Sequence, residues 1–368
     1  MDTFRPIAAR PAPKRVAGLL PWLRRNLFSS VGNTVATLLL FGLLAYLAMA
    51  GLSWGVIDAV FMADADLCQA ARGIGACWGV IAEKGRFIVM GRYPHAEHWR
   101  ALVAMLILLG LVLASCARWF WKPWLAALWF AGLAAFMVLM SGGVLGLSRV
   151  PTDLWGGLPL TLLLSVVCLA LAFPLAVLVA LGRRSNMPAI RSLCVIYIEL
   201  VRGVPLISVL FMASFMFPLF LPVGKSPDVL LRVMAGITLF AAAYMAEIVR
   251  GGLQTLGRGQ IEAAASIGLG YWQTQRKIVL PQALAAVVPG IMNNFIALFK
   301  DTSLVTIVSL YELSGALTLA VGSDPNWRPF KIEAYLFIAA IYFVFCFLMS
   351  RYSLRIERSL ARGAQRSA

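Results

Sequence analysis

Charged side chains are scarce in this chain. Only 13% of its 368 residues are Asp, Glu, Lys or Arg, whereas a soluble domain has about a quarter. Hydrophobic residues make up 61% of the sequence, and the mean hydropathy is +0.84. Because a helical span needs roughly 20 apolar residues, the apolar runs provide about eight spans. We therefore expect an all-α polytopic membrane protein rather than a globular domain.

Histidine is scarcer still, because the chain has only two. Both lie in His95-Ala96-Glu97-His98, which offers too few ligands for a metal site, and we interpret this segment as part of a solvated loop. Gly224-Lys225-Ser226 resembles the end of a phosphate-binding loop, but Leu219 stands where that motif needs its first glycine. With no Ser/His/Asp set either, we expect no catalytic residue, no metal and no ATP site in this chain.

Acidic residues are half as frequent as basic ones: 16 Asp and Glu against 32 Lys and Arg, for a net charge of +16. The basic residues lie at the ends of apolar runs and form no basic face with interleaved aromatics, so nucleic acid is not expected as a partner. With the N-terminus inside, basic residues in the inner segments outnumber those in the outer segments by roughly two to one. This bias predicts a multi-pass membrane protein with both termini in the cytoplasm; the family resemblance described below implies that the membrane is the bacterial inner membrane.

The apolar runs divide the chain into an extension and a core. We expect a basic cytoplasmic tail over residues 1–30, a three-span extension over 31–150 with a long periplasmic loop over 57–100, a core over 154–357 and a cytoplasmic tail over 358–368. We also expect the first span to remain as an uncleaved anchor. The expected spans are Val31–Val56, Ala101–Ala117, Trp124–Leu147, Leu158–Gly182, Val195–Leu221, Val233–Val249, Ala283–Phe299 and Ala334–Ser350.

Six cysteines are present, and four of them lie in or beside expected spans as small apolar residues. The other two, Cys68 and Cys77, fall in the loop placed outside the cytoplasm, where a disulfide can persist. A Cys68–Cys77 bridge and two free thiols are both compatible with the sequence.

The most specific pattern is the segment Glu262–Pro281, EAAASIGLGYWQTQRKIVLP. Its helix formers, two glycines and terminal proline predict a short helix, a glycine-hinged turn, a second short helix and then a span. The order and spacing of its residues resemble the EAA loop of binding-protein-dependent ABC importers, by which the permease meets its ATPase. The positions that carry the resemblance are Glu262, Ala263, Ala264, Gly268, Ile278, Leu280 and Pro281.

Two further segments, Glu199–Leu206 and Lys300–Leu304, resemble the polar amino acid permease branch of that family. The extension resembles the longer permeases of general L-amino acid importers. The resemblance implies a type I permease core of five spans, an EAA loop over 251–281, and import of polar L-amino acids with broad specificity. It also implies cytoplasmic ATPase subunits that bind ATP and Mg²⁺, a second permease subunit (homologous or identical), a periplasmic amino-acid-binding protein and surrounding lipid.

Ionisable residues within spans are costly and therefore default to functional candidates. Glu199 and Arg202 are three residues apart, which predicts a pair on one helix face. Lys300 and Asp301 lie where a span breaks, an arrangement suited to a zwitterionic ligand. The candidate gate and pathway residues are Glu199, Arg202, Pro205, Glu247, Lys300, Asp301, Thr302 and Ser303.

Alternatives remain at this point. The same residues are also compatible with internal pairs that only hold helices together. An ion-coupled secondary amino acid transporter would use Glu199, Glu247 or Asp301 as its coupling carboxylate. A structural subunit or a membrane-embedded enzyme is a further alternative, although no residue set supports the enzyme.

Overall fold

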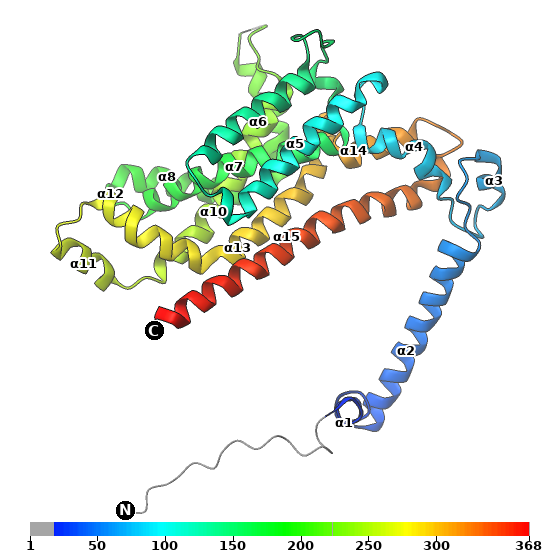
Figure 1. Ribbon diagram of the computed structural model, residues 1–368, viewed down its shortest axis with the longest axis horizontal. Coiled ribbons are helices and arrows are strands. Elements are labelled where there is room, and N and C mark those ends of the chain that lie inside the picture. Colours follow the sequence, from blue (N-terminus) through cyan, green and yellow to red (C-terminus); the bar gives the residue numbers. More distant parts are fainter. Residues whose placement is uncertain (1–17, 223, 368) are drawn as a thin grey trace, which may run out of the picture. The chain divides into compact units, whose positions relative to one another are not determined.

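The computed structural model describes residues 18–222 and 224–367 (Figure 1). Residues 1–17 and 368 of the predicted tails lie outside the described part. Within it, the chain is helical apart from turns and two isolated β-bridges. The predicted all-α class is confirmed. The chain forms two compact units that divide after Gly79.

The first unit contains one long apolar helix. Helix α1 (Leu19–Asn26) precedes α2 (Val31–Leu52), which continues through a π-helical turn, η1 (Ser53–Ile57). Helix α3 (Ala65–Ala70) follows and is capped by the Asp64 carboxylate, which accepts hydrogen bonds from two backbone N–H groups. A Cys68–Cys77 disulfide closes this region. The predicted loop over 57–100 is therefore partly helical.

The second unit contains the remaining helices, and Figure 1 labels most of them. Their bounds are α4 (Gly79–Met90), α5 (His98–Cys116), α6 (Trp124–Ser141), α7 (Gly157–Arg183), α8 (Pro188–Arg202), α9 (Leu206–Phe211), α10 (Val229–Gln254), α11 (Arg258–Ser266), α12 (Tyr271–Thr274), α13 (Leu280–Asp301), α14 (Leu313–Gly322) and α15 (Lys331–Ser367).

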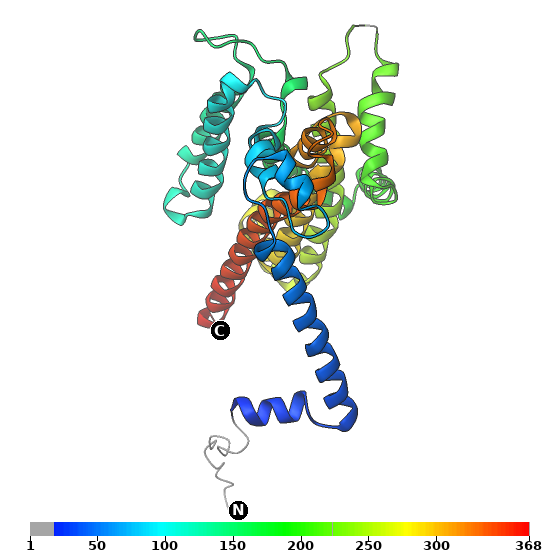
Figure 2. The ribbon, with the colours of Figure 1, turned by 90° about the vertical axis from the view of Figure 1, so that its right-hand side faces the viewer.

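Helix α7 is the central helix of this unit. It packs against α10, α8, α13 and α14, and residues 157–165 are all buried. A helix that is apolar all round is stable at the centre of a bundle, where every face meets another apolar surface. Helices α6 and α15 bury far less of their apolar surface. The α5–α6 hairpin stands at the edge of the bundle (Figure 2), so its outer face is suited to lipid.

Seven described helices are long and apolar enough to cross a membrane, or eight if one bent pair is a single span. The bent pair corrects the prediction of a continuous span over Val195–Leu221. Helix α8 ends at Arg202, and α9 begins at Leu206 after a bend of 105°. Pro205 lacks a backbone N–H and restricts the conformation of Val204, so the first helix cannot continue through this point.

A buried arginine fixes the α5–α6 hairpin. The Arg100 side chain is fully buried; its Nε donates to the Leu139 carbonyl at 2.8 Å and its Nη1 to the Ser148 carbonyl at 3.0 Å. Glu97 lies 3.3 Å from the guanidinium group. The prediction that residues 95–98 form part of a solvated loop is therefore wrong for His98, whereas the Glu97 side chain remains partly exposed. The His98 ring is buried, and its Nδ1 accepts from Arg86 at 2.9 Å.

The final helix is longer than the expected last span. Helix α15 begins at Lys331 and continues as a helix to Ser367. The predicted tail over 358–368 is therefore helical as far as it is described, because the basic residues after Ser350 favour helix as readily as the apolar ones before them.

The disulfide yields a direct prediction. Both cysteine side chains are fully buried, and the bond removes both thiols. We expect alkylation of the unreduced, denatured protein to leave Cys68 and Cys77 unmodified, and alkylation after reduction to add two further labels. Intact mass measurement checks this, and labelling of either residue without reductant would contradict the bridge.

Candidate functional site

The segment predicted as a docking loop consists of two short helices joined by a glycine turn. Helix α11 ends at Ser266, and Gly268 then adopts a φ of +79°. Its N–H donates to the Ala265 carbonyl at 3.0 Å, and the Leu269 N–H donates to the Ala264 carbonyl at 3.1 Å. A Cβ at Gly268 would meet no atom within 4 Å. Glycine is therefore favoured by the left-handed backbone itself and not by crowding.

The second short helix leads directly into a long helix. Helix α12 continues through a π-helical turn, η7 (Gln275–Val279), into α13, with Pro281 in the first turn of that helix. The predicted order of elements is confirmed, but no break separates the second short helix from the span. Pro281 has no N–H to donate backwards, and the widened turn before it accommodates this loss.

The loop exposes apolar side chains that the sequence analysis did not single out. Ile267 is 73% exposed, Trp272 is 66% exposed and Tyr271 is 56% exposed. Of the motif residues, Glu262 and Ala263 are exposed, whereas Ala264 is buried. Large apolar groups exposed on both sides of an ordered turn are typical of a surface that binds another protein. Their signal in the sequence is that they flank Gly268 and Gly270.

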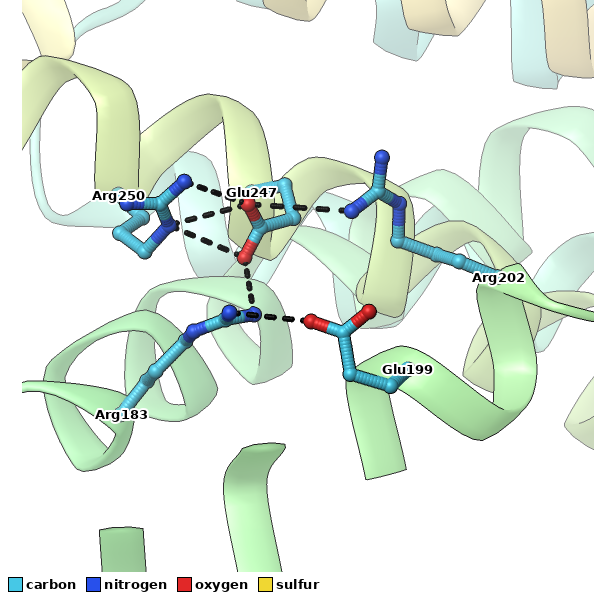
Figure 3. A network of polar contacts seen from close by, with 5 residues as sticks. All are labelled: Arg183, Glu199, Arg202, Glu247 and Arg250. Atoms are coloured by element: carbon cyan, nitrogen blue, oxygen red, sulfur yellow. Dashed lines mark hydrogen bonds and ion pairs between the residues drawn. The ribbon is translucent and has the colours of Figure 1, made fainter. Parts of the chain in front are cut away.

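A cluster of five charged residues lies at the ends of α7, α8 and α10 (Figure 3). Glu247 of α10 is its centre: Arg183 Nη1 lies 2.5 Å from one carboxylate oxygen, Arg250 Nη2 lies 2.8 Å from the other, and Arg202 Nη1 lies 3.8 Å away. Glu199 pairs with Arg183 at 3.0 Å. The Glu247 side chain is 15% exposed, so solvent screens these contacts only in part.

Two expectations change here. The predicted Glu199–Arg202 pair does not form: Glu199 turns to Arg183, while Arg202 turns to Glu247 and lies over the Tyr244 ring, 5.5 Å from its centre. Helical spacing permitted the pair, but α8 packs against α7 and α10, which offer each residue another partner. The sequence analysis also missed Arg183 and Arg250, which it treated only as charges marking the ends of spans.

The segment around Lys300 forms a different site. Lys300 and Ser303 line an open, mostly apolar surface cavity of about 590 Å³ together with Ser314 of α14 and Tyr342 of α15. Thr302 is buried and donates to the Phe299 carbonyl at 2.7 Å, and Asp301 is partly buried. The expected break at Lys300 and Asp301 is wrong, because α13 continues directly into a 3-10 helix, η8 (Thr302–Val308), within one helical run. The run ends only at Ser309, which adopts a left-handed backbone with a φ of +64°.

A buried carboxylate beside this cavity was not foreseen. Glu312 is fully buried, and its carboxylate accepts hydrogen bonds from the Tyr342 hydroxyl at 2.9 Å, the Thr161 hydroxyl at 3.1 Å and the Ser314 N–H at 2.8 Å. It caps α14 and so links that helix to α7 and α15. The available signal was an acidic residue immediately before a ten-residue apolar run, which is typical of a helix N-cap.

The Glu247 cluster yields a stability prediction. Glu247→Ala leaves three guanidinium groups without their shared carboxylate, so we expect a loss of about 2 to 3 kcal/mol, reduced from the cost of a fully buried pair because of partial exposure. Glu199→Ala is the matched control. That side chain is 58% exposed, so we expect a loss of less than about 1 kcal/mol. Thermal unfolding in detergent measures both, and equal shifts would contradict the central role of Glu247.

Comparison with known proteins is consistent with this geometry. The family model described as the inner membrane component of binding-protein-dependent transport systems matches residues 172–362. The chain is 46% identical, over 96% of each sequence, to the inner membrane amino-acid ABC transporter permease protein YhdY of Escherichia coli strain K12. It is 38% identical, over 97% of each sequence, to the glutamate/glutamine/aspartate/asparagine transport system permease protein BztC of Rhodobacter capsulatus.

A shorter relative and a solved structure match only part of the chain. The glutamate/aspartate import permease protein GltK of Escherichia coli O157:H7 is 34% identical over 51% of this chain and 84% of its own length. A crystal structure of an amino acid ABC transporter with histidines is 28% identical and has a TM-score of 0.48 over 55% of this chain and 92% of its own. From the family model and the two full-length relatives, the chain belongs to the family of binding-protein-dependent transport system inner membrane components, the permease subunits of ABC importers.

Proposed function

We propose that this chain is the membrane-spanning permease subunit of an importer that carries polar L-amino acids with broad specificity across the inner membrane. The relatives that match over nearly the whole chain, including the extension, are permeases of amino-acid transporters. One of them is named for four different amino acids, acidic and amide. The extension that it shares with this chain supports broad rather than narrow specificity.

The ordered turn at Gly268 is the observation that carries the proposal. It places Ile267 and Trp272 in solvent on a segment that contacts the rest of the chain mainly through η7 and α13. Apolar groups exposed in this way need a partner. A cytoplasmic ATPase subunit that accommodates α11 and α12 in a groove would bury them, and it would bind the ATP and Mg²⁺ that power transport.

Close contacts at the ends of α7, α10 and α13 provide a route for movement from the docking loop to the spans. Only residues 255–257 separate α10 from α11. The Arg184 guanidinium donates to the Leu253 carbonyl at 2.6 Å, and a Cβ at Gly252 would lie 2.4 Å from the Ala283 carbonyl oxygen. A displacement of α11 would therefore act on tightly held ends of α7, α10 and α13, which move as rigid elements.

The remaining parts of the proposal follow from the family and the charge bias. Residues 154–357 form the transport core, with the docking loop and both termini in the cytoplasm. The core pairs with a second permease subunit, homologous or identical, and receives solute from a periplasmic binding protein. Glu199, Arg202, Pro205 and Glu247 belong to the gate, and residues 300–303 belong to the solute pathway beside the cavity.

A substitution pair within the loop tests docking. Gly268→Ala forces a side chain onto a left-handed backbone at a cost of about 1 to 2 kcal/mol, so we expect ATP-dependent uptake to fall about five- to thirtyfold, and Gly268→Asp to abolish it. Gly259→Ala is the control, because Gly259 lies in α11 with no atom within 4 Å of an added Cβ and no positive φ. Uptake into proteoliposomes containing the assembled transporter measures the effect.

Co-purification separates docking from misfolding. In mild detergent, the Gly268 variants should insert and remain monodisperse while retaining less ATPase subunit than the Gly259 variant. Normal ATP-dependent uptake with Gly268→Asp would overturn the docking role. Uptake by the isolated chain, driven by an ion gradient without ATP, would overturn the proposed function itself.

A further inference from the structure

The short helix α14 is held at both ends by one segment of the N-terminal extension. After its C-terminal end, Asp324 accepts a hydrogen bond from the Lys84 ammonium group of α4 at 2.8 Å. Before its N-terminal end, the Arg92 guanidinium lies over the ring of Tyr311, 5.6 Å from the ring centre. Two cations eight residues apart therefore contact the two residues that bracket α14. We call the segment Lys84–Arg92 the brace.

Close backbone packing fixes the same segment against the core. The Gly157 N–H donates to the Tyr311 carbonyl at 3.0 Å. A Cβ at Gly91 would lie 2.5 Å from the Gly156 carbonyl carbon, and one at Gly157 would lie 2.2 Å from the Val89 carbonyl oxygen. Three stretches of chain thus meet at distances that exclude side chains. The backbone of the brace is therefore packed tightly into the second unit.

The Lys84–Asp324 ion pair of the brace is partly shielded from solvent. The Lys84 side chain is 20% exposed and that of Asp324 is 29% exposed. The hydrogen bond from Lys84 lowers the pKa of the Asp324 carboxyl from its ordinary value. The Asp324 carboxyl is therefore ionised at neutral pH, and the partly shielded pair keeps more of its strength than a fully solvated one.

Helix α14, which the brace contacts at both ends, forms part of the cavity wall. Helix α14 contributes Ser314 to the lining, and its cap Glu312 accepts a hydrogen bond from Tyr342, which also lines the cavity. A shift of α14 would move the Ser314 hydroxyl and the hydrogen-bond partner of Tyr342 together. The geometry of this wall therefore depends on contacts at both ends of α14.

We infer that Lys84 and Arg92 are positioning residues for transport, and that the extension serves to hold α14 in the conformation that accepts solute. This inference rests on the proposed function for its solute, but the brace itself does not depend on it. If only a fraction of the protein has α14 in place, the apparent affinity for solute falls by that fraction. Loosening the brace should therefore change half-saturation more than turnover.

Hydrogen exchange of the assembled transporter tests the mechanical part. In Lys84→Met and in Arg92→Met, we expect amide exchange over residues 311–324 to accelerate about two- to fivefold, the range expected for loss of a partly exposed pair. Lys84→Arg should restore the slow exchange. Lys225→Met removes another exposed cation and should leave exchange unchanged. Unchanged exchange in both Met variants, or no restoration by arginine, would overturn the brace.

Uptake kinetics test the positioning role. We expect Lys84→Met to raise the KM for L-glutamine about two- to fivefold with kcat reduced less than twofold, and Lys84→Arg to restore KM. A KM equal to that of the unsubstituted transporter would overturn the positioning role. Hydrogen exchange distinguishes failure of the brace from failure of the proposed function. Faster exchange in a protein that shows no ATP-dependent uptake of any amino acid would refute the proposed function but would still support the brace.

Discussion

The carboxylate of Glu247 is the group on which one end of the helical bundle depends. Arg183, Arg202 and Arg250 approach it from three helices. Without it, three like charges would repel one another in a region only partly open to solvent. The arrangement joins the C-terminal parts of α7, α8 and α10. Each helix contributes a charge that has no acceptable position within an apolar layer.

The position of the segment that we propose as the docking loop is constrained by this arrangement. Since α10 is held at its end by Glu247 and by the contact of Arg184 with the Leu253 carbonyl, α11 must begin close to that point. The left-handed backbone at Gly268 then turns the chain back into η7 and α13. The loop is therefore anchored on α10 before it and on α13 after it, and a force applied to it reaches both helices.

The extension has a different relation to the core. The relative GltK matches only 51% of this chain, over 84% of its own length. Within this chain, however, the backbone around Gly91, Gly156 and Gly157 is packed too closely for side chains. This close packing is the physical basis for the proposal that the extension affects the geometry of the cavity.

Local patterns in the sequence were sufficient for some of these features. The apolar runs predicted the helices, because a span must satisfy its own backbone hydrogen bonds. The spacing of Glu262, Gly268 and Pro281 predicted the helix–turn–helix order, because the glycine requirement is a property of the local backbone. The bend at Pro205 was not predicted, because the expected span ran through it.

The partners of the charged residues were decided only by tertiary structure. Helical spacing allowed Glu199 to pair with Arg202, but the crossing of α7, α8 and α10 directed them to Arg183 and Glu247 instead. Glu312 received its donors from Thr161 and Tyr342, which are 151 and 30 residues away in the chain. A single sequence determines which segments are helical and where a backbone must turn, because those are local energies. Which charges meet depends on how the helices pack, because packing brings together residues that no spacing relates.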